Sequence, residues 1–240
     1  MNGLLALIRK ELWQQFKTPV AYVVIAGFCG FWGLWLFGVM DFFAVGRASL
    51  RELFVVAPYL MAVVGPAVTM RSWSEERRSG TAETLLSMPV AVGSIVIAKF
   101  FAALITVLTA VAATLLVPVL ISPFGTFDAG EITAQYLGLV LLATASVSVG
   151  QFGSAFGRSQ MVAFIFSSAL LFLIALAQPL SGALGYEGVI AQLLRMVSSA
   201  ARLDSLNRGL LDFADLTYFL VVSALSLLAT VMIVARRKAR

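Results

Sequence analysis

The segment SWSEERRSGTAETLLSMPV, residues 72–90, is a charged interruption between two long apolar stretches. It carries five charged side chains in nineteen residues, whereas the stretches on either side read as helices inside a bilayer. A few polar residues would be enough to join two membrane helices. The charge density and patterning of residues 72–90 therefore indicate a function beyond joining two membrane helices.

The composition of the whole chain is that of a membrane protein. Of its 240 residues, 60% are hydrophobic and 12% are charged, against about 25% charged in soluble domains. The mean hydropathy is +0.97. The chain has no histidine, so the commonest general base and metal ligand is missing. The single cysteine, Cys29, cannot form an internal disulfide.

Apolar runs long enough to cross a bilayer predict an all-α polytopic membrane protein that forms a single transmembrane domain over residues 1–240. We expect six transmembrane helices, with Pro58 and Pro66 of the second tolerated inside a packed bundle. Their expected ranges are 20–40, 53–70, 95–121, 132–156, 162–180 and 216–235.

The distribution of basic residues predicts that both termini are cytoplasmic. With that orientation, most of the 17 Lys and Arg residues lie on the cytoplasmic side and most of the 12 acidic residues lie outside. The positive net charge is therefore a signal of topology, and it does not indicate binding to nucleic acid.

Three segments are expected not to span the membrane. Residues 3–17 have an apolar arc and a basic arc, which predicts an amphipathic helix lying in the cytoplasmic interface. Residues 72–90 are the charged segment. Residues 181–215 form a long outer connection with apolar content, for which we expect re-entrant or interfacial helices at the outer mouth of the bundle.

The sequence offers no catalytic constellation and no metal site. It lacks the G-x-x-x-x-G-K-[ST] motif that holds nucleotide phosphates, and it has no metal-ligand spacing and no pair of carboxylates within one span. Lys99 lies near the cytoplasmic end of its span and is expected to snorkel to the interface. The lack of an acid inside a span disfavours an ion-coupled carrier.

Polar residues recur along one side of the fourth span, at Thr144, Ser148 and Gln151. One interpretation is that they line a transport pathway. The other, which we favour, is a close-packed interface, because small residues such as Gly150, Gly153 and Gly157 are the ordinary packing solution between membrane helices.

Aromatic residues are concentrated on the first span, where two interpretations are again open. They could line a hydrophobic cavity, or they could face lipid and anchor the helix at the interface, which we expect. The residues concerned are Phe28, Phe31, Trp32, Trp35 and Phe37.

The first half of the charged segment predicts a helix that leaves the membrane and then ends. Ser72 and Glu75 have the spacing of a capping box, and the run from Glu75 to Arg78 favours helix. Gly80 then breaks the helix.

The second half predicts a short capped helix with an apolar side. Thr81 can cap it, Glu83 lies near its N-terminus, and Pro89 ends it. Leu85 and Leu86 form an apolar ridge, which a solvated loop seldom exposes. A docking surface for a partner therefore explains the pattern better than a loop whose charges serve topology alone.

The pattern E-E-R-R-x-G-T-x-E-x-L-L-x-x-P-V, at residues 75–90, resembles the cytoplasmic segment between spans two and three of ABC-2-type exporter permeases. The run SLNRGLLDFADLTYF, at residues 205–219, resembles a second segment of that family, just before its last span. The resemblance covers nearly the whole chain. Within the family, the sequence looks closest to gliding-motility-associated and nitrous-oxide-reductase-maturation-like permeases.

This resemblance implies a role for each non-spanning segment. Residues 81–88 would be a coupling helix in a groove of a separate ATP-binding subunit, and residues 75–78 would transmit its movement. Residues 157–160 would be a second contact, residues 3–17 a connecting helix, and residues 181–215 an exit gate. The residues implied in docking are Glu75, Glu76, Arg77, Arg78, Gly80, Thr81, Glu83, Leu85, Leu86, Pro89 and Arg158.

The resemblance also implies the partners and the location. A second permease chain, identical or related, would enclose the path, and a periplasmic or auxiliary subunit is a further possible partner. ATP and Mg²⁺ would bind the ATP-binding subunit, so this chain itself would hold no cofactor and would not be an enzyme. The location implied is the bacterial inner membrane.

We therefore expect the permease subunit of an ATP-driven exporter. Two alternatives stay open at this point. One is a membrane anchor or scaffold of a motility or assembly machine that uses ABC architecture without moving a solute. The other is an ATP-independent channel or carrier, which would leave the charged segment unexplained.

Overall fold

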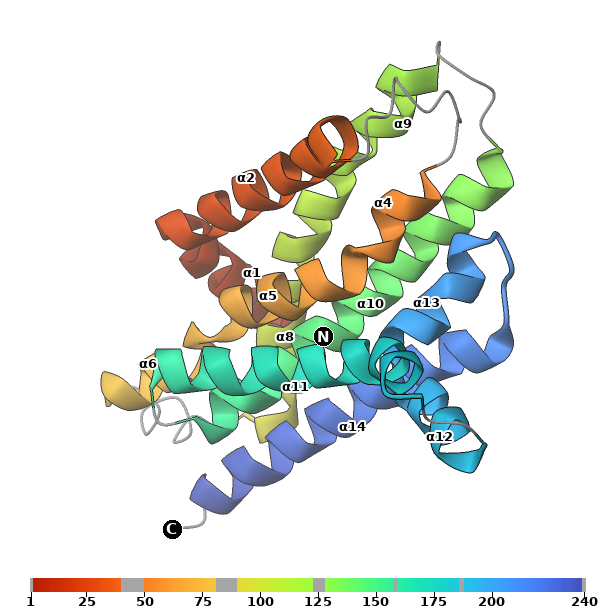
Figure 1. Ribbon diagram of the computed structural model, residues 1–240. Helices are drawn as coiled ribbons and strands as arrows, with labels where there is room; N and C mark the ends of the chain where they lie inside the picture. Colours follow the sequence, from red (N-terminus) through yellow and green to blue (C-terminus); the bar gives the residue numbers. More distant parts are fainter. Residues whose placement is uncertain are drawn as a thin grey trace.

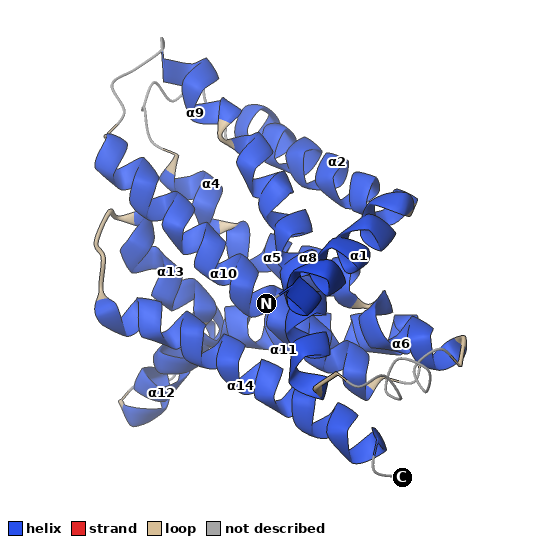
Figure 2. Cartoon of the chain, turned by 180° about the vertical axis from the view of Figure 1, so that it is seen from behind, coloured by secondary structure: helices blue, strands red, loops and turns tan. Residues whose placement is uncertain are grey.

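A computed structural model describes residues 2–39, 50–80, 90–122, 128–157, 159–185 and 188–238. All regular structure in these ranges is helical (Figure 2). The elements are α1 (Asn2–Lys17), α2 (Pro19–Leu34), the π-helical turn η1 (Trp35–Val39), α4 (Arg51–Val55), α5 (Ala57–Thr69), α6 (Arg71–Arg78), α8 (Val92–Thr114), α9 (Leu116–Ile121), α10 (Ala129–Phe156), α11 (Gln160–Ala183), α12 (Val189–Val197), α13 (Ser199–Asn207) and α14 (Phe213–Lys238).

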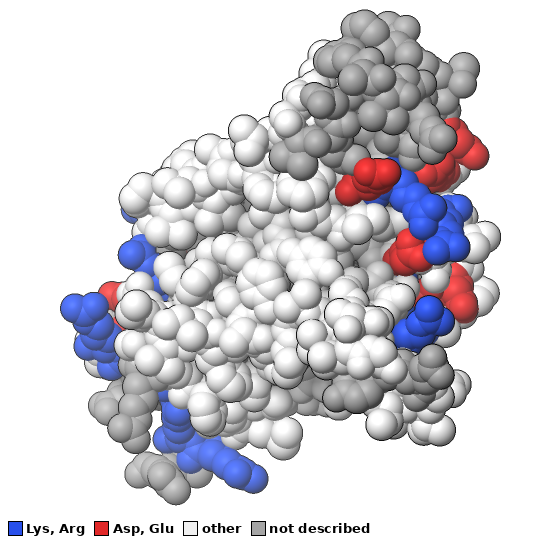
Figure 3. Space-filling model, viewed as in Figure 1, with Lys and Arg blue, Asp and Glu red and all other residues white. Residues whose placement is uncertain are grey.

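Within the described ranges, five helical stretches are long and apolar enough to cross a membrane. On the face seen in Figure 3, charged side chains gather on two opposite sides, and the described surface between them is almost free of charge. The expected all-helical, multi-pass membrane protein is therefore confirmed, but the expected number of six spans is not. The five stretches are Pro19–Gly38, Val92–Ile121, Ala129–Phe156, Gln160–Ala183 and Phe213–Arg237.

The predicted second span, residues 53–70, is broken into two helices. α4 ends at Val55 and α5 begins at Ala57, with Pro58 in its first turn. A proline ring clashes with the carbonyl four residues earlier, here that of Phe54, and proline donates no hydrogen bond, so the helix stops just before it. Most of α5 is buried by neighbouring helices, so the segment lies inside the bundle.

The long helix α10 runs through the middle of the molecule, beside α5, α8, α11, α13 and α14 (Figure 1). Glycines allow its close approaches. A Cβ on Gly150 would lie 2.2 Å from the Thr69 hydroxyl, and one on Gly157 would lie 2.8 Å from the Ala163 nitrogen. On α5, a Cβ on Gly65 would lie 2.7 Å from Ser146. The small residues at these positions pack helix against helix.

The aromatic residues of the first span do not share one environment. Phe28 and Trp32 are buried, and their rings stack with centroids 5.2 Å apart. The Phe54 ring packs edge-on against Trp32, with centroids 5.5 Å apart, and also contacts the Tyr136 ring. The expectation that these residues face lipid is wrong for Phe28 and Trp32, because the ring system joins α2 to α4 and α10. Phe37 alone of this set is largely exposed.

Two short helices, α12 and α13, form much of the predicted outer segment 181–215. α13 is tied to its neighbours by ion pairs: Asp204 binds Arg51 of α4 at 2.9 Å, and Arg202 binds Asp215 of α14 at 3.0 Å. Hydrogen bonds from Arg51 and Arg208 outweigh burial and lower the pKa of the Asp204 carboxyl. The re-entrant position of this segment relative to a membrane stays a prediction.

Replacing Gly65 with Ala tests the α5–α10 packing. The new methyl group would meet backbone atoms of Ser146 at 2.8–2.9 Å, so the helices must separate, at a cost of about 1–3 kcal/mol. The midpoint of thermal unfolding in detergent should fall. Gly27→Ala is the matched control, because no atom lies within 4 Å of its Cβ position, and it should be neutral or slightly stabilising. Equal effects of the two substitutions would contradict this packing.

Candidate functional site

The charged segment begins with α6, which continues almost directly from α5. α6 ends at Arg78, and Gly80 follows with a φ of +72°, a left-handed conformation that favours glycine. The predicted break at Gly80 is confirmed. The predicted capping box is wrong, because Ser72 lies inside α6 and Met70 precedes its first residue. The helix needs no new cap since α5 leads into it.

Lys99 of α8 is the centre of the site. Its ammonium group lies 2.9 Å from a carboxylate oxygen of Glu11 on α1 and 2.7 Å from one of Glu76 on α6. The side chain is only 4% exposed and its nitrogen lies 5.4 Å from the centre of the Trp73 ring. The expectation that Lys99 snorkels to the interface is wrong, because two carboxylates reach it where it is buried.

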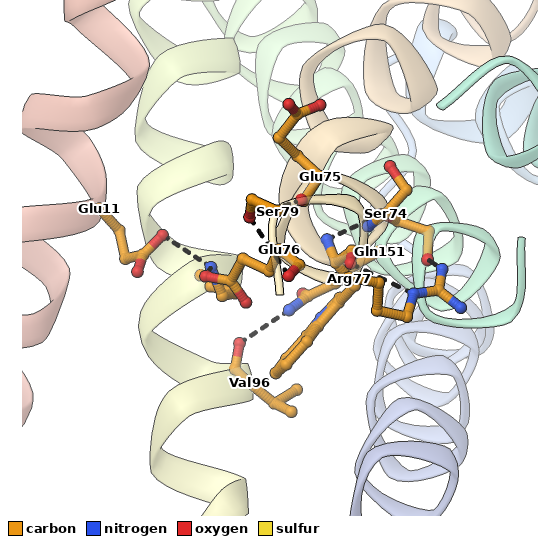
Figure 4. A network of polar contacts seen from close by, with 11 residues as sticks. Glu11, Ser74, Glu75, Glu76, Arg77, Ser79, Val96 and Gln151 are labelled. Atoms are coloured by element: carbon orange, nitrogen blue, oxygen red, sulfur yellow. Dashed lines mark hydrogen bonds and ion pairs between the residues drawn. The ribbon is translucent and has the colours of Figure 1, made fainter. Parts of the chain in front are cut away.

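These contacts join three helices that are distant in the sequence. Figure 4 shows Glu11 pointing from α1 toward α8, while Glu76 of α6 approaches from the opposite side. Burial raises the pKa of the Glu76 carboxyl, and the charge of Lys99 acts against that rise. Two turns further along α8, the Thr106 hydroxyl donates a hydrogen bond to the Gln15 side chain at 2.6 Å, which is a second polar contact between α1 and α8.

Arg77 fastens the other side of α6 to the end of α10. Its guanidinium donates to the carbonyl oxygens of Ser154, at 2.7 Å, and of Gly157. A cation at the C-terminal carbonyls of a helix is favourable because those oxygens have no partner within the helix. Burial lowers the pKa of the Arg77 guanidinium, and the charge of Arg237 lowers it further.

Ser154 and Gln151 complete the contact between α10 and its neighbours. The Ser154 hydroxyl oxygen accepts from the backbone N–H of Trp73 at 3.0 Å and donates to the carbonyl of Met70 at 3.0 Å. Gln151 donates to the carbonyl of Val96 on α8 at 3.0 Å (Figure 4). The junction of α5 with α6 is therefore held by side chains of α10.

The exposed side of α6 is hydrogen-bonded to Gln160, the first residue of α11. Gln160 accepts a hydrogen bond from Arg71 at 3.2 Å and donates one to Glu75. These contacts are exposed, so they contribute little to stability. They place Gln160, one residue of the predicted second contact with a partner, beside α6.

The structure brings five of the predicted docking residues together on and just after α6. Glu75, Arg78 and Gly80 are exposed, whereas Glu76 and Arg77 are half-buried in the contacts described above. The other six lie outside the described residues, and their role stays a prediction: Thr81, Glu83, Leu85, Leu86, Pro89 and Arg158.

The predicted polar stripe of α10 faces the interior of this chain. Ser148 and Gln151 are buried, Thr144 is half-buried, and the Thr144 and Ser148 hydroxyls donate to carbonyls of α10 itself. A role of these residues in lining a pathway stays a prediction.

Sequence reasoning missed Glu11, Gln15, Lys99 and Thr106 as parts of the site. A signal was present for Lys99, since a basic residue seven positions inside an apolar helix needs partners. Glu11 gave a weaker signal, as the one acid of the N-terminal helix. Their pairing depends on how α1 packs against α8, which no local pattern indicates.

A cavity of about 870 Å³ opens beside this cluster, between α1, the start of α2, α6, α8 and the start of α11. In the part of the chain that the structure describes, no three His, Cys, Asp or Glu residues lie close enough together to hold a metal ion. The ion pairs and hydrogen bonds of the cluster connect α6 firmly to the bundle.

Comparison with known proteins gives one match. The sequence profile of the family described as "ABC-2 family transporter protein" matches residues 29–235, which is most of the chain. No curated protein matches the sequence. The matched range includes the charged segment, but it excludes all of α1, residues 19–28 of α2 and the last three residues of α14.

Lys99→Met tests the buried ion-pair cluster. It leaves two carboxylates without their cation, which should cost about 3–5 kcal/mol and lower the thermal unfolding midpoint of the purified chain in detergent. The triple variant Lys99→Met, Glu11→Gln, Glu76→Gln has no buried charge left and should regain most of the loss. A triple variant as unstable as Lys99→Met would show that the charges are not the cause.

Arg77→Gln tests the bond between α6 and α10. Losing a charged donor to two carbonyls should cost about 2 kcal/mol, seen as a lower unfolding midpoint. The neighbouring Arg78→Gln is the control, because Arg78 is exposed and its replacement should change stability by less than about 0.5 kcal/mol. If both variants unfold at the same temperature, Arg77 does not fasten α6.

Proposed function

The chain belongs to the ABC-2 transporter family, and we propose that it is the permease subunit through which a separate ATP-binding subunit does work on the membrane. In this proposal the partner binds ATP and Mg²⁺ and docks on the coupling helix at residues 81–88, and residues 157–160 form a second contact. This chain performs no chemistry. Two such chains, identical or related, enclose the path in the bacterial inner membrane, with residues 181–215 at its outer end.

The observation that carries the proposal is the way α6 is fastened. Immediately before the predicted docking segment, α6 is bound through Lys99 to α1 and α8, and through Arg77 to α10. A solvated loop that served topology alone would need none of these buried contacts. A segment that a partner subunit displaces does need them, because its displacement reaches the other helices only through contacts that persist during the movement.

The contacts also suggest how movement would spread. When a partner displaces residues 81–89, α6 shifts with them and carries α8 and α1 through Lys99, and α10 through Arg77. α10 packs against α5, α11 and α14, so the displacement reaches the centre of the bundle. The bias between two bundle arrangements must come from differences in how the partner contacts each of them.

Export as the direction, and kinship with gliding-motility-associated permeases, are the finer parts of the proposal. They rest on the resemblance of residues 75–90 and 205–219. The sequence also admits a scaffold that uses the same ATP-driven movement without a solute, and the assay below separates the two when candidate substrates are added.

Glu83→Arg and Leu85→Asp test the coupling role directly. The chain is co-expressed with a candidate ATP-binding subunit from the same genome, and ATP hydrolysis by the purified complex is measured in lipid nanodiscs. Each substitution should reduce co-purification of the partner, or reduce its coupled ATP hydrolysis by about tenfold, while the chain still inserts in the membrane. Losing one anchor residue of an interface has this effect.

Arg9→Glu is the matched control, since it changes a charge on the N-terminal helix outside the proposed docking segment. It should leave assembly and ATP hydrolysis as they are. Unchanged assembly and hydrolysis in both Glu83→Arg and Leu85→Asp would contradict the coupling assignment. Hydrolysis that responds to those substitutions but to no candidate solute would favour the scaffold.

A further inference from the structure

The cavity beside the ion-pair cluster has a polar rim and an apolar wall. Its rim is formed by side chains of α1 and α6, and its wall includes Val20, Ala21 and Val68 from the start of α2 and the end of α5. At about 870 Å³, it is within the size range of ligand pockets, about 300–1,000 Å³.

The cavity extends from the end of the helices into their apolar part. Two residues of α8 line it, and they lie at different depths. Lys99 is seven residues from the start of α8 at Val92, about 10 Å along the axis, and Thr106 is fourteen residues from it, about 21 Å. The cavity therefore runs alongside α8 for about 10 Å, from Lys99 to Thr106.

The rim is basic. Four exposed cations stand around the opening, Lys10 and Lys17 from α1 and Arg71 and Arg78 from α6, against one exposed acid, Glu75. The two remaining acids that line the cavity, Glu11 and Glu76, are bound to Lys99. Among the described residues, Lys10, Lys17, Arg71 and Arg78 form no salt bridge with an acid. Arg71 donates to the neutral Gln160 side chain and the Lys17 ammonium lies 5.4 Å from the centre of the Trp13 ring, so no carboxylate neutralises these charges in a salt bridge.

We propose that this cavity binds an anionic phospholipid, with its phosphate headgroup between the cations of α1 and α6 and the start of one acyl chain along the wall formed by Val20, Ala21 and Val68. The phosphate is bound by charge and hydrogen bonds from Lys10, Lys17, Arg71 and Arg78. The acyl chain covers apolar surface that lies below the rim. A lipid in this place bridges the N-terminal helix and α6.

The apolar wall is the feature that favours a lipid over a free phosphate as the ligand. A soluble anion would use the basic rim alone and would leave the deeper apolar part of the cavity to water. Each basic residue near a membrane surface adds attraction for an anionic lipid, about fivefold in affinity. This site goes beyond the ATP-driven function, because it needs neither the partner nor ATP.

The test measures lipid binding to the full-length chain by native mass spectrometry from detergent. The probes are dioleoylphosphatidylglycerol, dioleoylphosphatidylcholine and glycerol 1-phosphate. We expect retention of phosphatidylglycerol in preference to phosphatidylcholine, and no retention of glycerol phosphate. The variant Lys10→Gln, Arg78→Gln should weaken phosphatidylglycerol binding by about thirtyfold, from two basic residues removed.

Arg9→Gln, Arg195→Gln is the matched control. It removes the same charge from exposed residues that do not line the cavity, so phosphatidylglycerol binding should be unchanged. Equal loss in the two double variants, or equal binding of phosphatidylglycerol and phosphatidylcholine, would overturn the proposal. Binding of glycerol phosphate as tight as that of the lipid would also overturn it and would identify a site for soluble phosphate.

Discussion

The packing of α1 and α6 against α8 depends on one buried ion-pair cluster, in which Lys99 lies between Glu11 and Glu76. Burying a single ammonium group in an apolar helix is costly, and the cost is offset only when carboxylates reach it in good geometry. Here those carboxylates come from α1 and α6. The cation of α8 therefore decides where the N-terminal helix and the start of the charged segment must lie.

The consequences extend to the other face of α6. Once Glu76 is held, the helix turns Arg77 toward the end of α10, where it meets the carbonyls of Ser154 and Gly157. Glycines along α10 and Gly65 on α5 let neighbouring helices pack closely in the apolar part of the bundle. Close packing in the apolar part and charge pairing at its end thus support the same position of α6.

Much of this fold could be predicted from the sequence, because apolar length and charge distribution determine spans. The break at Gly80 followed from the φ that only glycine adopts readily. The break at Pro58 was not expected, because a packed bundle can tolerate a proline, whereas here the helix stops before Pro58 although the segment is buried. The pairing of Lys99 and the burial of Trp32 depend on contacts between helices far apart in the sequence, and no local pattern contains them. The segment 81–89, which carries the strongest sequence motif, lies outside the described residues, so its docking role rests on the motif.

The central claim is that α6 and α1 move as one body because Lys99 holds both. Spin labels at Arg9→Cys and Ser79→Cys, in a Cys29→Ala background, report the distance between these helices by pulsed electron paramagnetic resonance. The claim predicts one narrow distance distribution whose mean is the same with and without ATP in the assembled complex, and which broadens in Lys99→Met. A mean that shifts by several ångströms on ATP binding, in the chain with Lys99 intact, would contradict it.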